Sequence, residues 1–277
     1  MTIMLELKLL RKLKREPYSE YKSVSDLSYL DMKSMYAIFE QYYLNTTFQL
    51  FKSDLLEKTG VFIVRDPKEN RLVGFSTILE RDFLVDGKAR HAFFSGDTII
   101  EKAYWGSRAL QRAMYRYVIR YKLRYPTKPV YWMLISKGFK TYLLLANNYY
   151  TYYPHYDQKH QHLQKYVESY CRQYFPNYFD EKTGLLDFGE NYQALRPDVA
   201  PISMEMREEN GKIAFFERCN PTWVNGTELP CIGEIHWKDL YRYVQRFLTK
   251  SKSKGDDKIV VKPMRPTLAF EEDSKVA

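Results

Sequence analysis

Cysteine is scarce in this sequence of 277 residues, and the three cysteines that are present lie far apart. Cys171, Cys219 and Cys231 are odd in number and have no CxxC spacing. The sequence therefore predicts neither a disulfide framework nor a zinc knuckle. We expect a reducing, cytoplasmic setting.

Long apolar runs are also missing. The longest are far too short to span a bilayer, and the first residues have no signal-peptide pattern. The opening MLELKLLRKLKRE nevertheless places Leu5, Leu9 and Leu13 at helical spacing among basic residues. This pattern indicates either a helix that makes peripheral contact with a membrane or a first helix or strand that docks on its own domain, and the short apolar stripe favours docking.

Several catalytic signatures are absent as well. The chain has no GxSxG, P-loop, HExxH or dinucleotide-binding motif, which argues against the hydrolase, nucleotide-binding and zinc-protease classes that depend on them. His155, His160 and His162 cluster in PHYDQKHQH, but no paired ligand stands elsewhere in the sequence. We interpret them as a solvated helix start and expect no metal.

Positive charge and tyrosine are abundant instead. The formal net charge is +9 at pH 7, and the chain has 25 Tyr and 16 Phe. The charge favours an anionic partner: nucleic acid, a phosphate-bearing cofactor, an acidic protein or a membrane surface. Tyrosine suits half-buried surfaces and pockets, because its ring packs while its hydroxyl stays hydrogen-bonded.

The first half of the chain has clear periodicity. Ser28 and Asp31 form a capping-box pattern before a helix, and 53–58 fits a second short helix. Three successive antiparallel strands are then predicted at 61–66, 72–85 and 88–100, with Asp86-Gly87 as a tight-hairpin signal.

Helices and strands alternate after the strand trio, and the regularity weakens beyond His155. An apolar stripe after Trp105 predicts a helix packed on the sheet. The remaining predictions are a strand at 128–135, a helix after it, a helix at 162–175, strands at 213–218 and 230–235, and a last helix at 237–248. This order indicates a mixed α/β layout.

The stretch DTIIEKAYWGSRALQRAMYRY connects a strand to a helix through a short turn. Such a turn presents backbone N–H groups at the helix N-terminus, where the helix dipole also favours an anion, and pyrophosphate is the natural guest. Arginines recur along the helix at positions 108, 112, 116, 120 and 124.

These elements resemble the GNAT superfamily of acyltransferases from about Tyr18 to Tyr153. In that family the fourth strand, a pyrophosphate loop and the third helix hold the pantetheine and pyrophosphate of acyl-CoA. GDTIIEKAYWGSRALQRAMYRY occupies the place of this unit. VYWMLISKGFKTYLLL occupies that of the fifth strand and fourth helix, and the acyl thioester lies between the two strands.

The resemblance implies an α/β (α+β) fold with a mixed, mostly antiparallel central sheet flanked by helices. Residues 1–155 would form this GNAT-like core. We expect residues 156–250 to be a C-terminal α+β extension packed on the core, and residues 251–277 to be a flexible tail.

The donor loop departs from the family pattern of Gln or Arg, two residues, Gly, one residue, then Gly or Ala. Gly106 is the only glycine of the loop, and side chains in place of glycine crowd a pyrophosphate. Arg108 and Arg112 would compensate with charge-assisted contacts. The donor-binding residues implied are Ile99, Ile100, Tyr104, Trp105, Gly106, Ser107, Arg108 and Arg112.

The implied activity is an N-acyltransferase that moves an acyl group from a thioester to an amine. The donor would be acyl-CoA or an acyl carrier protein, as in the acyl-homoserine lactone synthase and N-acyl amino acid synthase branches. A basic helix suits docking of an acidic carrier, although it would also suit a plain solvated face. We expect the donor as a substrate and no permanently bound cofactor.

Acyl transfer to an amine needs an unprotonated amine, a polarised carbonyl and often a proton for the departing thiolate. In the resembling family an acidic residue or water near the fourth strand often serves as base, and a Tyr of the fourth helix as acid. Asp97 lies on the matching strand and Tyr142 close to the matching helical position; His91 and Glu101 are further candidates. Asp97 could instead cap or pair, and Tyr142 could be a core residue.

A second hypothesis is a non-catalytic module of the same fold that binds nucleic acid or another anionic partner through the basic helix. At 3.6 residues per turn, however, a residue at every fourth position turns by about 40° per step. Arg108 and Arg124 should therefore point in different directions, which disfavours a single nucleic-acid groove.

Overall fold

The computed structural model describes residues 16–189, 194–195 and 201–250. The chain divides into two compact units, Met1–Leu240 and Tyr241–Ala277, and each is described by itself. The predicted basic N-terminal helix, with its membrane contact, and the predicted tail at 251–277 lie outside the described residues. In the part that is described, no helix is both long and apolar enough to cross a bilayer.

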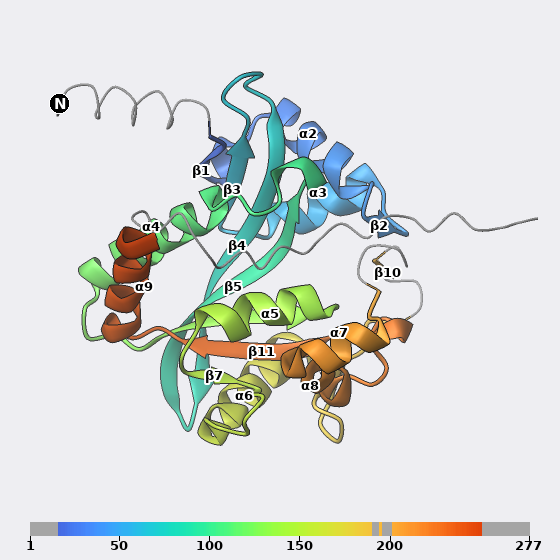
Figure 1. The fold of residues 1–277 in the computed structure, drawn as a ribbon, viewed down its shortest axis with the longest axis vertical. Helices are drawn as coiled ribbons and strands as arrows, with labels where there is room; N and C mark the ends of the chain where they lie inside the picture. The colour runs from blue at the N-terminus through green and yellow to red at the C-terminus, as the bar shows by residue number, and fades with distance from the viewer. Residues whose placement is uncertain (1–15, 190–193, 196–200, 251–277) are drawn as a thin grey trace, which may run out of the picture. The chain divides into compact units, whose positions relative to one another are not determined.

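A seven-stranded sheet runs through the first unit (Figure 1). All neighbouring strands are antiparallel except β5 and β6, which are parallel. The predicted strand trio is confirmed as β3, β4 and β5, while β1 was not predicted. In spatial order the strands are β1 (Tyr18–Ser23), β3 (Gly60–Arg65), β4 (Leu72–Val85), β5 (Lys88–Ile100), β6 (Val130–Ser136), β11 (Leu229–Glu234) and β7 (Tyr152–Tyr153).

Two small sheets and a set of helices complete the described chain. β2 (Tyr43–Leu44) pairs with β10 (Ala194–Leu195), and β8 (Phe179–Asp180) pairs with β9 (Leu185–Leu186). The helices are α2 (Tyr29–Phe39), α3 (Phe48–Leu56), α4 (Ala109–Arg124), α5 (Phe139–Asn148), α6 (Gln164–Tyr174), α7 (Met204–Glu209), α8 (Gly211–Cys219) and α9 (Trp237–Lys250). Short 3₁₀ turns lie at Val24–Asp26, Lys102–Tyr104, Gln161–Leu163 and Trp223–Asn225. α3 begins earlier than the predicted 53–58, because Thr47 caps it by accepting the Leu50 N–H.

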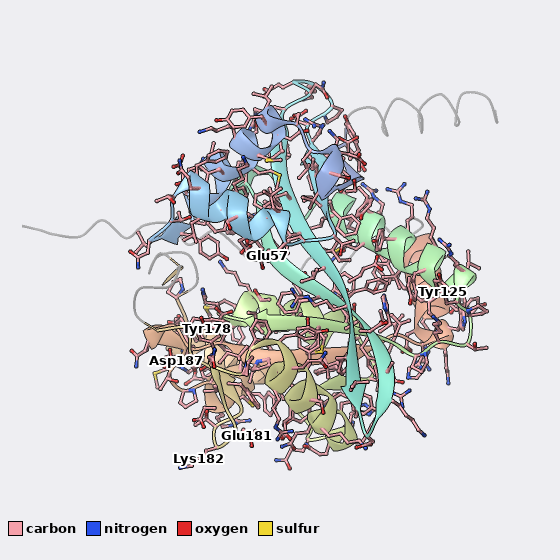
Figure 2. The ribbon with its side chains drawn as sticks, turned by 180° about the vertical axis from the view of Figure 1, so that it is seen from behind. Glu57, Tyr125, Tyr178, Glu181, Lys182 and Asp187 are labelled. Atoms are coloured by element: carbon pink, nitrogen blue, oxygen red, sulfur yellow. The ribbon has the colours of Figure 1, made fainter. Side chains whose placement is uncertain are left out.

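Helices cover both faces of the sheet, as Figures 1 and 2 show from opposite sides. On one face, α4 and α5 share a core with the strands around Phe93 and Trp132, and α8 packs on α5. On the other face, α2 and α3 enclose Phe75, while α6 encloses Phe94 in a separate cluster. The predicted mixed, mostly antiparallel sheet flanked by helices is therefore confirmed.

One predicted strand is wrong. Residues 213–218 lie in helix α8, which Asn210 caps by accepting the Lys212 N–H. Ile213 and Phe216 are both buried, at helical spacing, on the side of α8 that packs against α5. Burial at this spacing favours a helix, and it outweighs the preference of an aromatic run for a strand. The predicted strand at 230–235 is confirmed as β11, which lies between β6 and β7.

Asp31 ties the first turn of α2 to the edge of the sheet. It completes the predicted capping box with Ser28, and it accepts bonds from Arg65 at 2.8 Å and Lys22 at 2.9 Å. Burial by itself would raise the pKa of Asp31, but the hydrogen bonds from Lys22, Arg65 and Ser28 lower it to about 2. This carboxylate is therefore a structural one.

We predict that Asp31→Asn lowers the free energy of unfolding by about 2 kcal/mol at pH 7, because two cations lose a charged partner. The pKa of Asp31 is lower in the folded chain than its ordinary 3.8. Its stabilisation is therefore complete above that value and disappears as the pH falls toward 2. Urea unfolding of both proteins at pH 7 and near pH 2 measures the loss. The exposed Asp26→Asn is the control, and an equal loss in it would contradict the assignment.

Candidate active site

Strands β5 and β6 pair over only part of their length. Their parallel ladder begins with His91 opposite Val130 and ends with Ser95 opposite Leu134. Beyond that point β5 continues along β4 to Ile100, and β6 continues along β11. Among the described strands, the facing edges of β5 and β6 have no ladder partner past this end, so two neighbouring strands separate here.

A β-bulge lies at this separation. The register between β4 and β5 shifts between Ser76 and Ile78, so Thr77 of β4 faces both Gly96 and Asp97 of β5. Glycine is required at position 96, because a Cβ there would collide with the Thr77 hydroxyl. The hydroxyl is buried without a hydrogen-bond partner. Bulges bend a strand and often lie next to active sites, and Asp97 is one of the two residues that this bulge carries.

Asp97 lies at the separation in surroundings that favour its neutral form. It shares a face of β5 with Ile99, which packs in the α2–α3 cluster. Asp97 is half-buried. The loss of water around its carboxyl, with Asp54 nearby, raises the pKa of Asp97 to about 7. A carboxyl that titrates near neutral pH can act as a general base under physiological conditions.

Two ion pairs act on Asp97. In one, the Lys58 ammonium lies 2.7 Å from the Asp54 carboxylate; in the other, Lys137 lies 3.0 Å from Glu228. The lysines lower the pKa of Asp97, and Glu228 raises it. Our sequence predictions included none of these four residues. The available signal was their position, because Lys137 directly follows β6 and Glu228 directly precedes β11.

The predicted donor loop follows β5. Ile99 is buried, and the Ile100 carbonyl accepts the indole N–H of Trp105 at 2.8 Å. The Tyr104 hydroxyl donates to Asp66 at 2.5 Å. These bonds hold the loop against the sheet while Trp105 stays 47% exposed.

The end of this loop starts helix α4. Gly106 has a positive φ of +84°, which favours glycine, and open space surrounds it. The Ser107 hydroxyl accepts the Ala109 N–H at 3.2 Å. Arg108 is exposed at the N-cap position without a side-chain cap bond. N–H groups of the first helical turn have no intrahelical acceptor, so a positive end stands beside the separation.

Cations gather at the same place. The Lys140 ammonium, at the start of α5, lies 4.9 Å from the centre of the Trp105 ring. Burial and the nearby Lys102 lower the pKa of Lys140. Arg112 is turned partly toward Glu16, 3.8 Å away. The donor loop and the start of α5 therefore form one positively charged corner.

Glu101 and His91 lie apart from Asp97. Glu101 forms a two-pronged ion pair with Arg71, with one contact at 3.0 Å. His91 lies at the other end of the β5–β6 ladder, 2.7 Å from Asp82. Burial would lower the pKa of His91, but Glu80 and Asp82 raise it overall. The structure does not bring either residue to the bulge.

Tyr142 is also separated from Asp97. Its side chain is fully buried, and its hydroxyl donates to the Pro154 carbonyl at 3.1 Å, beside β7. Burial raises its pKa. Since β6 and β11 stand between β5 and β7 in the sheet, this hydroxyl does not reach the bulge. Its role as an acid stays a prediction without a supporting contact.

The rest of the arginine row lies along α4. Arg116 and Arg120 line a shallow depression of about 190 Å³ together with Tyr21 of β1 and Tyr117. This depression is on the β1 side of α4 and does not include the bulge. Among the residues that are described, no group of three or more His, Cys, Asp or Glu is arranged to hold a metal ion.

Comparisons with known proteins find only remote likenesses. No family model matches the sequence, and no curated protein matches it. Similar solved structures include Escherichia coli ElaA, which is 20% identical over 50% of this chain and 88% of that chain, with a TM-score of 0.33. A probable N-acyltransferase of Enterococcus faecalis V583 is 15% identical over 48% and 32%, with a TM-score of 0.35. Saccharomyces cerevisiae N-myristoyltransferase with bound myristoyl-CoA is 14% identical over 44% and 34%, with a TM-score of 0.32.

This chain spans only about a third of the length of the last two proteins. Likenesses this slight carry no argument about function. Within the described residues, the strand order, the single parallel pair β5–β6 and the helix α4 that joins those two strands form the arrangement that the GNAT resemblance of the sequence predicts.

The raised pKa of Asp97 predicts a pH-dependent cost in stability. Because the folded chain holds this proton up to about pH 7 and the ordinary pKa is 3.8, ionisation destabilises the fold between these values. The wild type should therefore lose stability relative to Asp97→Asn as the pH rises from 4 toward 7. The difference should then stay constant. Thermal melting of both proteins over this pH series measures it, and a difference that does not vary with pH would refute the assignment.

Proposed function

We propose that this protein is an N-acyltransferase that moves an acyl group from an acyl thioester to an amine. One observation carries the proposal: the parallel strands β5 and β6 separate at a bulge that carries Asp97, whose pKa is raised to about 7. A helix N-terminus and a cationic corner lie at the same end of β5. Asp97 as the base and the start of α4 as the anion site thus lie at the same end of the β5–β6 ladder.

The separated edge of β5 suits the arm of the donor. From Gly96 to Ile99, this edge offers backbone N–H and C=O groups that β6 no longer pairs. A pantetheine arm carries two amides, and an extended chain with amides can pair with such an edge as an added strand does. Its phosphate would then meet the first turn of α4, with Arg108 and Lys102 beside it.

The proposed reaction uses Asp97 as the base. The amine nitrogen attacks the thioester carbonyl carbon, and as the C–N bond forms its proton passes to the Asp97 carboxylate. The C–S bond then breaks, and the sulfur leaves as a thiolate that takes up a proton from water, while Asp97 releases its proton to the solvent and is ready for the next turnover. Because the thioester is already reactive, holding amine and carbonyl together supplies much of the rate. Acceptor and donor would approach from opposite faces of the sheet, since Asp97 lies on the α2–α3 side.

We also propose that residues 156–250 act as an extension that completes the site. This segment supplies β11, which pairs with β6, and Glu228, which acts on Asp97. The donor is acyl-CoA or an acyl carrier protein, and the charge around the loop suits the phosphate that both carry. No permanently bound cofactor is needed for the step.

The first test is turnover with a panel of acyl-CoAs and acyl carrier proteins, read as thiol release in the presence of amines. Asp97→Asn should lower kcat by about 100-fold or more, the usual loss for a missing general base. In the wild type, kcat should rise with pH and level off above about 7.

The matched control is Asp86→Asn at the exposed tip of the β4–β5 hairpin, where asparagine suits the positive φ of 52°. It should keep full activity. No turnover with any donor would refute the proposal, and salt-sensitive binding of single-stranded RNA would then favour the binding-module alternative.

The second test concerns the donor phosphates. Arg108→Ala should raise KM for acyl-CoA about tenfold with kcat nearly unchanged, the size of one charge-assisted bond. Arg124→Ala, at the far end of α4, is the matched control and should leave KM unchanged. With an acyl-pantetheine that carries no phosphate as the donor, KM should be the same in the wild type and in Arg108→Ala. Equal losses in the two variants would show that general charge, and not a site at the helix start, binds the donor.

A further inference from the structure

Two buried charges lie at the ends of strands beside the separation of β5 and β6. Lys137 follows β6 and Glu228 precedes β11, and the adjoining residues Ser136 and Leu229 face each other in the ladder. The Lys137 ammonium lies 3.0 Å from the Glu228 carboxylate, and the side chains are only 13% and 5% exposed. The sheet register itself therefore brings this pair together.

The fold does not depend on this pair to position its backbone. The Glu228 N–H and C=O both bond to Leu186, at 2.8 Å and 2.9 Å. Moving a charged group from water into a protein interior costs on the order of several kcal/mol per ion. Apolar side chains of similar size often stabilise a core at least as well as a buried ion pair does. A buried ion pair at this place therefore favours a role in the site.

The parallel ladder directs the pair toward the bulge. Ser95 and Leu134 are the last partners of β5 and β6; Asp97 follows the first and Lys137 the second within a few residues. Parallel neighbours run in the same direction, so both side chains leave the sheet at the same end.

A second ion pair, at the end of α3, also acts on Asp97. Asp54 of α3 and Lys58, just after α3, are 2.7 Å apart. The stem of Lys58 passes close to Gly96 of the bulge, with its Cε 3.6 Å from where a Cβ would stand. The charged groups that act on Asp97 are thus Asp54 and Lys58 on the α3 side, Lys137 after β6 and Glu228 before β11.

We propose that Lys137 and Glu228 are positioning residues whose opposite charges set the pH at which Asp97 becomes a base. The inference rests on the proposed function, in which Asp97 accepts the proton of the amine. Lys137 favours the ionised carboxylate, and Glu228 opposes it. Lys137 has the larger effect of the two. The pair therefore keeps Asp97 ionised at a lower pH than burial alone would allow.

The test is the acidic limb of the pH–rate profile in the full-length protein. Glu228→Gln keeps the shape of the side chain and can still accept a bond from Lys137, but it removes the negative charge. The limb should move to lower pH by roughly one unit, the size of shift expected from one nearby charge. The matched control is Glu181→Gln, which breaks an exposed pair with Arg172 and should leave the limb in place.

A second variant reverses the direction. Adding Lys137→Met to Glu228→Gln removes the positive charge, so the limb should move to higher pH than in Glu228→Gln. Because Lys137 acts more strongly than Glu228, it should also lie above that of the wild type. This double variant removes the buried pair as a unit and so decides the matter even if Glu228→Gln does not fold. Folded variants whose limbs stay at the wild-type pH would overturn the proposal.

A readout without turnover separates this inference from the proposed function. The wild type, Glu228→Gln and the double variant are each compared with the same protein carrying Asp97→Asn. In each comparison, the difference in the free energy of unfolding should level off at the pH where Asp97 ionises. That pH should be lower in Glu228→Gln and higher in the double variant. An unchanged value overturns the role of the pair, whereas absent turnover with shifted values would overturn the acyltransferase assignment alone.

Discussion

The parallel pairing of β5 with β6 is the constraint on which the site depends. Antiparallel neighbours can be joined by a tight turn, but parallel neighbours need a crossover, and here α4 provides it. Because both strands run in the same direction, the start of α4 after β5 and the start of α5 after β6 lie at the same edge of the sheet. Two helix N-termini, Lys102 and Lys140 then collect where the ladder ends. The positive corner is thus a consequence of topology.

Two carboxylates show how the same chemistry is directed to structure or to reactivity. Asp31 accepts direct bonds from Lys22 and Arg65, which lower its pKa to about 2 and make it a fixed anion. Charges of both signs act on Asp97, but the loss of water around its carboxyl has the largest effect, and the pKa rises to about 7. The bulge that carries Asp97 is what separates it from a regular ladder position.

Local signals in the sequence predicted much of the fold. The hairpin at Asp86, the capping box at Ser28 and the apolar stripe of α4 each depend on residues close together in the chain, and each is confirmed. Asp97 could be proposed for a different reason, because the GNAT resemblance implies an acidic residue near this strand. α8 could not be distinguished from a strand, because a short aromatic run has no clear period and its burial against α5 is a tertiary effect.

Long-range pairing explains what the sequence did not reveal at the site. Glu228 reaches Lys137 only because β11 inserts next to β6, and no local pattern specifies that neighbour. The same insertion places β7 two strands away from β6, which takes the hydroxyl of Tyr142 away from the bulge. Tyr142, matched by its position on a helix, therefore lies away from the bulge, whereas Lys137 and Glu228, at the ends of buried strands, act on Asp97.

The lone glycine of the donor loop has a physical counterpart in this arrangement. Gly106 supplies the single positive φ that the turn needs, while Trp105 and Ser107 brace the loop with their own hydrogen bonds. Side chains therefore fill space that further glycines would leave open for a pyrophosphate. The positive charges of Lys102, Arg108 and Lys140 would then have to supply the phosphate-binding energy that the few accessible backbone amides do not. Such charge recognises a phosphate without demanding one geometry, so under the proposed function the loop would accept phosphopantetheine on either a nucleotide or a carrier protein.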